Sequence, residues 1–227
     1  MKIQGLCLAV ALITALASAT VAPAADIVTV PTANQLKQGN VELNYFHIEL
    51  DAPRSMPQAI RAQTLCVGLT DAIELDAHRY DVDKVGDDTI WNATYKLMDE
   101  SLLTPDLVVG VRDVTADMAG ASYFVSAAKT LNPSGAGADM LPVIRGHLSL
   151  GTSDDTLLDE ERHEGFFGGV QVTLRADPEV GFFALHDGRD LITGGSFTPG
   201  PRLPTLKGGT FGDHWWVGLS YTISPPG

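Results

Sequence analysis

His147 and Ser149 are the residues whose types and spacing come nearest to a catalytic pair. Residues two apart on a β-strand point to the same face, so the imidazole could take the proton of the hydroxyl. An acidic side chain such as Glu161 could then orient the imidazole, as in a catalytic triad. Glu161 is only one of several carboxylates in its segment, so we interpret the pattern as a chance pairing and predict no enzymatic activity.

Acidic segments are the second feature that could do chemistry, because carboxylates can bind metal ions. Asp81 to Asp88 begins with the Asp-x-Asp spacing of a calcium loop and has Gly86 at the sixth place. Val85 at the fifth place and Asn92 at the twelfth leave the oxygen cage incomplete. The segment therefore favours a solvated hairpin turn, and the acidic run 154–164 favours a solvated loop. We predict no metal site and no cofactor.

The charge balance excludes one class of partner. The chain has 227 residues, with 15 Lys and Arg against 28 Asp and Glu, which gives a net charge of −13. Nucleic-acid binding requires a basic face, so no nucleic-acid partner is expected. The sequence also has no Gly-x-Ser-x-Gly elbow, no phosphate-binding loop and no dinucleotide fingerprint.

The first 24 residues have the pattern of a secretory signal peptide. Lys2 precedes an apolar run from Leu6 to Ala19, and Ala22-Pro23-Ala24 is an A-x-A cleavage site. Residues 25–40 are then expected to form a periplasmic N-terminal segment, and residues 41–227 the folded domain. Cys66 would be the single cysteine of the exported chain, so no internal disulfide is expected.

Period-two alternation of apolar and polar residues follows almost to the C-terminus and predicts an all-β fold. In Thr89 to Leu97, for example, Trp91 and Tyr95 share one face while Asn92 and Lys96 share the other. Turn residues separate the segments. The twelve expected strands cover 41–50, 59–68, 72–80, 89–97, 106–114, 121–130, 142–150, 165–175, 180–187, 190–197, 203–210 and 215–223.

These strands suit either a soluble β-sandwich or a closed antiparallel transmembrane β-barrel of about 12 strands. Most have about the 9 to 11 residues that cross a bilayer, and an even number closes the sheet without an exposed edge. The polar faces also carry charges that a dry core would bury at a cost of several kcal/mol each. We therefore expect a barrel whose lumen is lined by Arg61, Glu74, Asp76, Lys96, Arg112 and Arg145.

Several motifs together resemble the YjbH-like outer-membrane barrel family. They are Pro31-Thr32-Ala33 with Gly39, the segment 68–74, the segment 105–113 with Tyr123 and Lys129, and His186-Asp187-Gly188-Arg189-Asp190 with Gly194. The resemblance implies a non-enzymatic barrel in the bacterial outer membrane, linked to exopolysaccharide production or export. Its partners would be outer-membrane lipid and polysaccharide or export machinery.

Two other functions remain open at this point. One is a soluble periplasmic or secreted β-sandwich that binds carbohydrate. The other is a barrel enzyme, because the spacing of His147 and Ser149 with Glu161 is similar to that of the outer-membrane lipid A deacylases. Leu150 stands where that family commonly has Asn, which argues against the second function.

Overall fold

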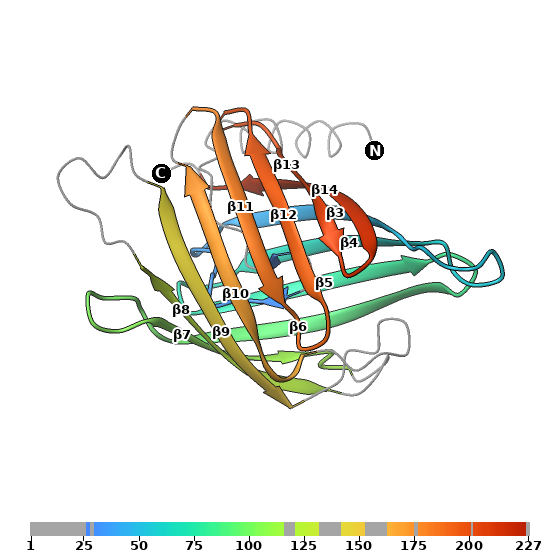
Figure 1. Cartoon of the computed structure of the whole chain (residues 1–227). Helices are drawn as coiled ribbons and strands as arrows, with labels where there is room; N and C mark the ends of the chain where they lie inside the picture. Colours follow the sequence, from blue (N-terminus) through green and yellow to red (C-terminus); the bar gives the residue numbers. More distant parts are fainter. Residues whose placement is uncertain are drawn as a thin grey trace, which may run out of the picture.

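Twelve antiparallel strands form one closed barrel, as the sequence predicts (Figure 1). The structure, a computed structural model, describes residues 26–27, 30–115, 121–131, 142–152, 163–174, 177–200 and 202–225. The barrel strands are β3 (Val41–Glu49), β4 (Ala59–Gly68), β5 (Ile73–Val82), β6 (Gly86–Met98), β7 (Asp106–Arg112), β8 (Ser122–Thr130), β9 (Val143–Thr152), β10 (Glu164–Leu174), β11 (Glu179–His186), β12 (Leu191–Thr198), β13 (Thr205–Phe211) and β14 (His214–Ile223). A separate two-stranded sheet pairs β1 (Asp26–Ile27) with β2 (Val30–Pro31).

Every strand pairs with its neighbours in the sequence, and the pairing of β14 with β3 closes the ring. Nine residue pairs join these two strands, from Trp215 opposite Glu49 to Ile223 opposite Val41. Closure leaves no free strand edge. We call the end where β3 begins and β14 ends the terminal end, and the end that holds the 50–58 and 187–190 connections the distal end. The expected signal peptide, 1–24, lies outside the described residues.

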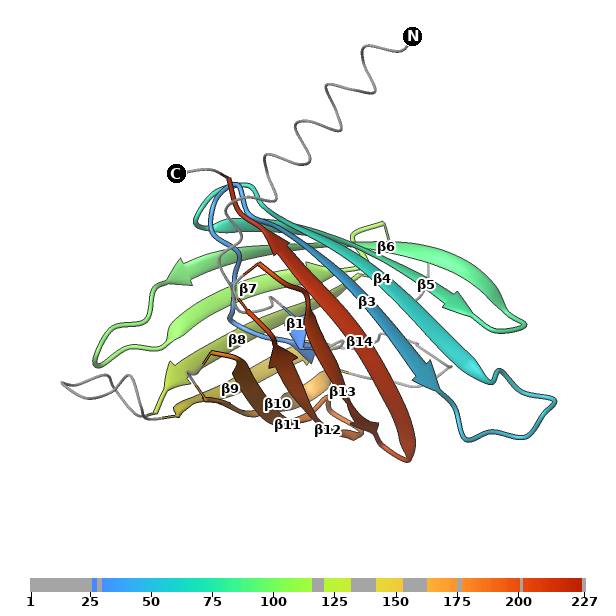
Figure 2. The same cartoon turned by 90° about the horizontal axis from the view of Figure 1, so that it is seen from above.

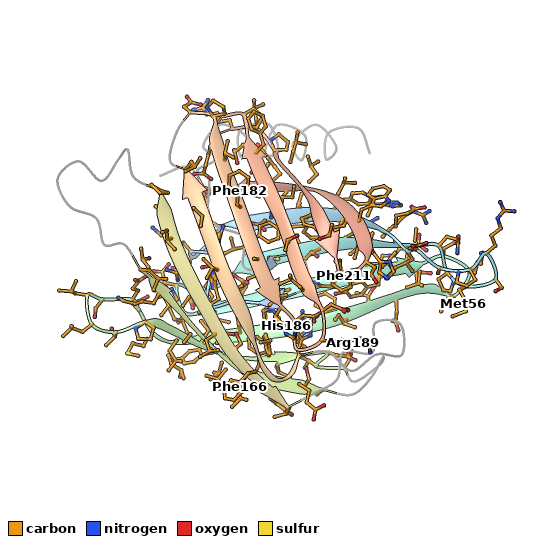
Figure 3. The ribbon with its side chains drawn as sticks, viewed as in Figure 1. Met56, Phe166, Phe182, His186, Arg189 and Phe211 are labelled. Carbon is orange, nitrogen blue, oxygen red and sulfur yellow. The ribbon has the colours of Figure 1, made fainter. Side chains whose placement is uncertain are left out.

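Large apolar side chains are exposed on the outer wall of every barrel strand except β7. Phe166 on β10 is 71% exposed and Phe182 on β11 is 55% exposed, and both side chains point away from the barrel (Figure 3). The other large exposed apolar side chains of the strands include Leu43, Tyr45, Leu65, Leu75, Trp91, Tyr95, Leu97, Tyr123, Val125, Leu148, Leu150, Val170, Leu174, Leu206, Trp215, Val217 and Leu219. We call this surface the outer belt. The described part of the chain has no helix that is long and apolar enough to cross a membrane.

The inner wall is apolar in its distal half, which the sequence analysis did not anticipate. Trp216 is the centre of this region: its ring lies 5.9 Å from the rings of Phe46 and Phe183, edge-on to the first and stacked on the second. Aromatic contacts of this kind add to the free energy gained from burial. The remaining side chains of the cluster are Val30, Ile48, Leu50, Ile60, Ala62, Tyr80, Ile90, Phe124, Phe167, Leu185, Ile192 and Phe211. We call this cluster the apolar core of the lumen.

Glycines on the inner wall make room for these rings. Gly218 lies directly opposite Phe46 in the β3–β14 pair, and a Cβ atom there would come within 2.5 Å of the Phe46 ring. Gly110 has the same relation to Phe124 across β7 and β8. An aromatic ring that covers a cross-strand glycine shields the exposed backbone and fixes the register. The core therefore depends on glycine opposite each of these two rings.

The chain before β3 runs inside the barrel. Val30 belongs to the apolar core, and Ala33 packs against Val108 and Ala128 of the inner wall. Figure 2, a view from above, shows β1 within the ring of strands. Leu36 is 1% exposed, and after it the chain turns at Gly39 to enter β3. We call residues 30–36 the lumen segment. The sequence analysis expects a periplasmic N-terminal segment at residues 25–40, and the structure packs residues 30–36 of it against the inner wall of the barrel.

Candidate functional site

Five of the six predicted lumen residues lie on the inner wall, and the sixth does not. Glu74, Asp76 and Arg112 are each at most 4% exposed, and Lys96 and Arg145 line a cavity at the terminal end. Arg61 instead lies on the outer wall, where its guanidinium contacts the Asp81 carboxylate at 3.1 Å and both side chains are more than 40% exposed. The prediction that Arg61 lines the lumen is therefore wrong.

The reason is that the polarity of the two walls inverts along β3, β4 and β5. On β4, Ile60 and Ala62 face the lumen near the distal end, whereas Leu65 faces outward nearer the terminal end. The distal parts of these strands therefore have a polar outer face and an apolar inner face. Arg61 belongs to this distal part. An alternating pattern reveals that two faces exist, but it does not reveal which one faces outward when the apolar side changes within one strand.

Arg145 is the centre of the polar half of the lumen. One terminal nitrogen contacts Glu100 at 2.7 Å, the other contacts Asp106, and Nε donates to the side-chain oxygen of Asn34 at 2.9 Å. The guanidinium side chain is 17% exposed, and the Glu100 and Asp106 side chains are 21% and 14% exposed. These contacts join β7, β9, the 99–105 connection and the lumen segment, so we call this group the Arg145 cluster.

Glu100 in the same cluster lies outside the strands and is held as a carboxylate. Burial alone would raise its pKa, but hydrogen bonds from the backbone and side chain of Thr130, together with Lys129 and Arg145, lower the pKa below its ordinary value. Lys129 reaches it at 3.2 Å. The sequence analysis missed Glu100 because it lies in a connection between strands, where carboxylates are usually solvated.

A second polar group fixes the other side of the lumen segment. The backbone N–H of Leu36 donates to the Glu74 carboxylate at 2.6 Å, and the Gln35 amide donates to the Thr94 hydroxyl at 2.8 Å. Asp76 follows Glu74 on the same inner face of β5, and both side chains are buried. Predicted lumen residues from β5 and β9 thus bind the segment from two sides of the barrel.

Ser149 and His147 share the inner face of β9, as their spacing predicts, but no hydrogen bond joins them. The Ser149 hydroxyl pairs with the Ser126 hydroxyl at 2.6 Å and lies 3.4 Å from the Pro31 carbonyl oxygen. Both ring nitrogens of His147 are buried without a hydrogen-bond partner among the described residues. Glu161 lies outside the described residues. The described geometry contains no activated serine.

The acidic segment 81–88 forms a hairpin at the distal end. Asp81 pairs with Asp87 across β5 and β6, and a three-residue turn, 83–85, joins these strands. Arg61 neutralises Asp81, and Arg79 contacts Asp87 at 2.8 Å. Among the described residues, no group of His, Cys, Asp and Glu side chains is arranged to hold a metal ion.

The terminal end of the lumen contains a cavity of about 440 Å³. The lumen segment forms one side through Ala33, Asn34 and Gln35, and strands β6 to β11 form the other. The apolar core lies nearer the distal end than the lining of this cavity does, so the described inner wall is mostly polar toward the terminal end and mostly apolar toward the distal end. The sequence matches no protein-family model and no curated protein.

Proposed function

We propose that this chain is a non-enzymatic β-barrel protein of the bacterial outer membrane with a closed lumen. The outer belt is the observation that carries the proposal. Soluble proteins rarely expose contiguous apolar patches beyond a few hundred Å², whereas large exposed apolar side chains lie on every barrel strand except β7. A lipid-facing wall accounts for this pattern, because hydrocarbon accepts apolar side chains and a closed sheet satisfies every backbone group.

The closed lumen favours a binding or structural role in the envelope over conduction. Water-filled channels have polar interiors, whereas here the apolar core occupies the distal half of the described interior and the lumen segment runs inside the barrel. The soluble β-sandwich is excluded by the fold, because the sheet closes on itself and Trp91, Leu148 and Trp215 face outward. The resemblance to YjbH-like barrels supports the further proposal of a link to exopolysaccharide production.

Fractionation of cells that express the full chain tests the membrane location. The protein should stay in the membrane pellet through a carbonate wash, and it should migrate differently on a gel before and after heating. Purified protein in a planar bilayer should show no conductance steps. Recovery of the folded chain in the soluble fraction would contradict the proposal.

The absence of enzymatic activity and the polysaccharide link need separate tests. Lipid A from cells that express the protein should keep its mass, and Ser149→Ala should change nothing. A loss of one acyl chain that disappears in Ser149→Ala would show a deacylase instead. Secreted polysaccharide should fall when the gene is removed and recover when it is restored; unchanged polysaccharide would contradict the link.

A further inference from the structure

The cavity at the terminal end is lined by groups of two kinds, those that already have partners and those that are available to a ligand. The Arg145 guanidinium is occupied, because it bonds Asn34, Glu100, Thr130 and Asp106. Arg145 and Asp106 also neutralise each other. These residues therefore shape the wall and contribute little net charge to a ligand.

The available groups are Lys96, Gln171 and Thr173. Gln171 and Thr173 lie on the inner face of β10, about 6.6 Å apart along the strand. Neither side chain forms a hydrogen bond within the part of the chain that the structure describes. Among the described residues, the Lys96 ammonium forms one ion pair, with Asp99 at 3.2 Å; the Lys96 side chain is 19% exposed and the Asp99 side chain is 86% exposed. Because the carboxylate of this pair is well hydrated, the pair contributes little free energy, and a ligand anion can replace Asp99.

These groups select a ligand class by their chemistry. Gln171 and Thr173 each supply a donor and an acceptor, which suits hydroxyl groups, because a hydroxyl also donates and accepts. Lys96 supplies one positive charge, which suits one carboxylate. The other lining side chains, Ala33 and Val143 among them, include no aromatic ring, so a flat apolar ligand would find no stacking surface. A second anionic group on the ligand would meet Glu179, and Arg145, the other cation of the lining, is already paired.

We propose that this cavity binds a small polyhydroxylated monocarboxylate, such as a sugar acid, with the carboxylate on Lys96 and hydroxyls on Gln171 and Thr173. A cavity of about 440 Å³ is within the range of small-molecule sites. The inference goes beyond the proposed function and is independent of the membrane location, since the cavity is a feature of the folded chain itself.

Titration calorimetry of the purified full chain in detergent tests the site, with glucuronate, glucose and acetate as probes. Glucuronate should bind to one saturable site, and more tightly than glucose or acetate, because only glucuronate satisfies both kinds of group. Absence of saturable glucuronate binding, or equal affinity for glucose and glucuronate, would overturn the proposal.

Substitutions test which side chains of the cavity bind glucuronate. Lys96→Met should weaken glucuronate binding about tenfold, the value of one charge-assisted hydrogen bond. Gln171→Leu should weaken the binding of both glucuronate and glucose. The matched controls are Lys84→Met in the β5–β6 turn and Gln63→Leu on the outer wall, which should leave binding unchanged. Unaltered glucuronate binding by Lys96→Met would overturn the assignment.

A measurement on the unaltered protein keeps the test valid if a variant fails to fold. Lysine acetylation followed by mass spectrometry should show that glucuronate protects Lys96 and leaves Lys84 reactive. Lys84 is the appropriate reference because it lies at the distal end, with its side chain 46% exposed. Equal reactivity of Lys96 with and without glucuronate would contradict the site.

Discussion

At the scale of single residues, the partly buried ion pairs of the Arg145 cluster differ from the exposed pairs on the outer wall. Arg145 faces two carboxylates that are less than a quarter exposed, whereas Arg79 and Asp87 are each 57% exposed. A partly buried carboxylate that loses its partner must bear its desolvation cost uncompensated. An exposed pair loses little, because water replaces the partner.

Arg145→Met should therefore destabilise the barrel by about 2 kcal/mol, less than for a fully buried pair because these side chains are partly exposed. Arg79→Met, the matched control, should cost less than about 1 kcal/mol. Urea unfolding in detergent micelles, followed by tryptophan fluorescence, measures both variants. Equal effects of the two substitutions would show that Arg145 has no special role.

Glu100 provides a pH-dependent contribution to stability at the same cluster. Its pKa is lowered in the folded chain, so folding favours the carboxylate over the acid. This stability is fully present above the unfolded-state pKa and is lost as the pH falls through the lower folded-state pKa. Urea midpoints should therefore fall more steeply below the ordinary glutamate pKa in the natural chain than in Glu100→Gln. Parallel pH profiles would refute this contribution.

At the scale of elements, the sequence predicts all twelve barrel strands but not the lumen segment. Alternation identifies strands because outward apolar residues alternate with inward polar residues along the backbone. Trp91, which faces outward, and Asn92, which faces inward, are an example. The lumen segment has no such pattern. Its position is set by partners distant in sequence, such as Glu74 and Arg145, 38 and 111 residues from Leu36 and Asn34. No local signal encodes such contacts.

Because local patterns do not encode contacts between distant residues, only part of the candidate site could be predicted from the sequence. Five lumen residues could be identified because a charge opposite an apolar face indicates the inner wall. The apolar core could not, since Phe46 and Trp216 occupy inward positions that a polar lining was expected to fill. Only the three-dimensional closure of the sheet places these rings together with Phe183.

Gly68 is the element-scale test of the lumen segment. A Cβ atom at Gly68 would lie 2.3 Å from the carbonyl oxygen of Lys37 and 2.9 Å from that of Leu36. Both are backbone atoms, so Gly68→Ala should displace the chain next to the lumen segment and make residues 30–40 more sensitive to protease. At Gly208 the nearest atom would be 3.4 Å away, so Gly208→Ala is the control and should keep the native cleavage pattern. Equal protection in both variants would contradict the packing of this segment.

At the scale of the whole molecule, the central claim is that the outer belt faces lipid while the distal half of the lumen is a packed apolar core. The three tryptophans of the chain sample both surfaces. Trp91 and Trp215 are each 51% exposed on the outer wall, whereas Trp216, the neighbour of Trp215 on β14, is 1% exposed in the apolar core. Adjacent residues of one strand thus report on opposite faces.

Fluorescence quenching by lipids with brominated acyl chains tests this claim most directly. Three single-tryptophan variants, with the other two positions changed to Phe, are reconstituted in such bilayers, and native strand content is checked by circular dichroism. The account predicts strong quenching of Trp91 and Trp215 and weak quenching of Trp216. Quenching of Trp216 as strong as that of its neighbour Trp215, or no quenching of the two outer residues, would contradict it.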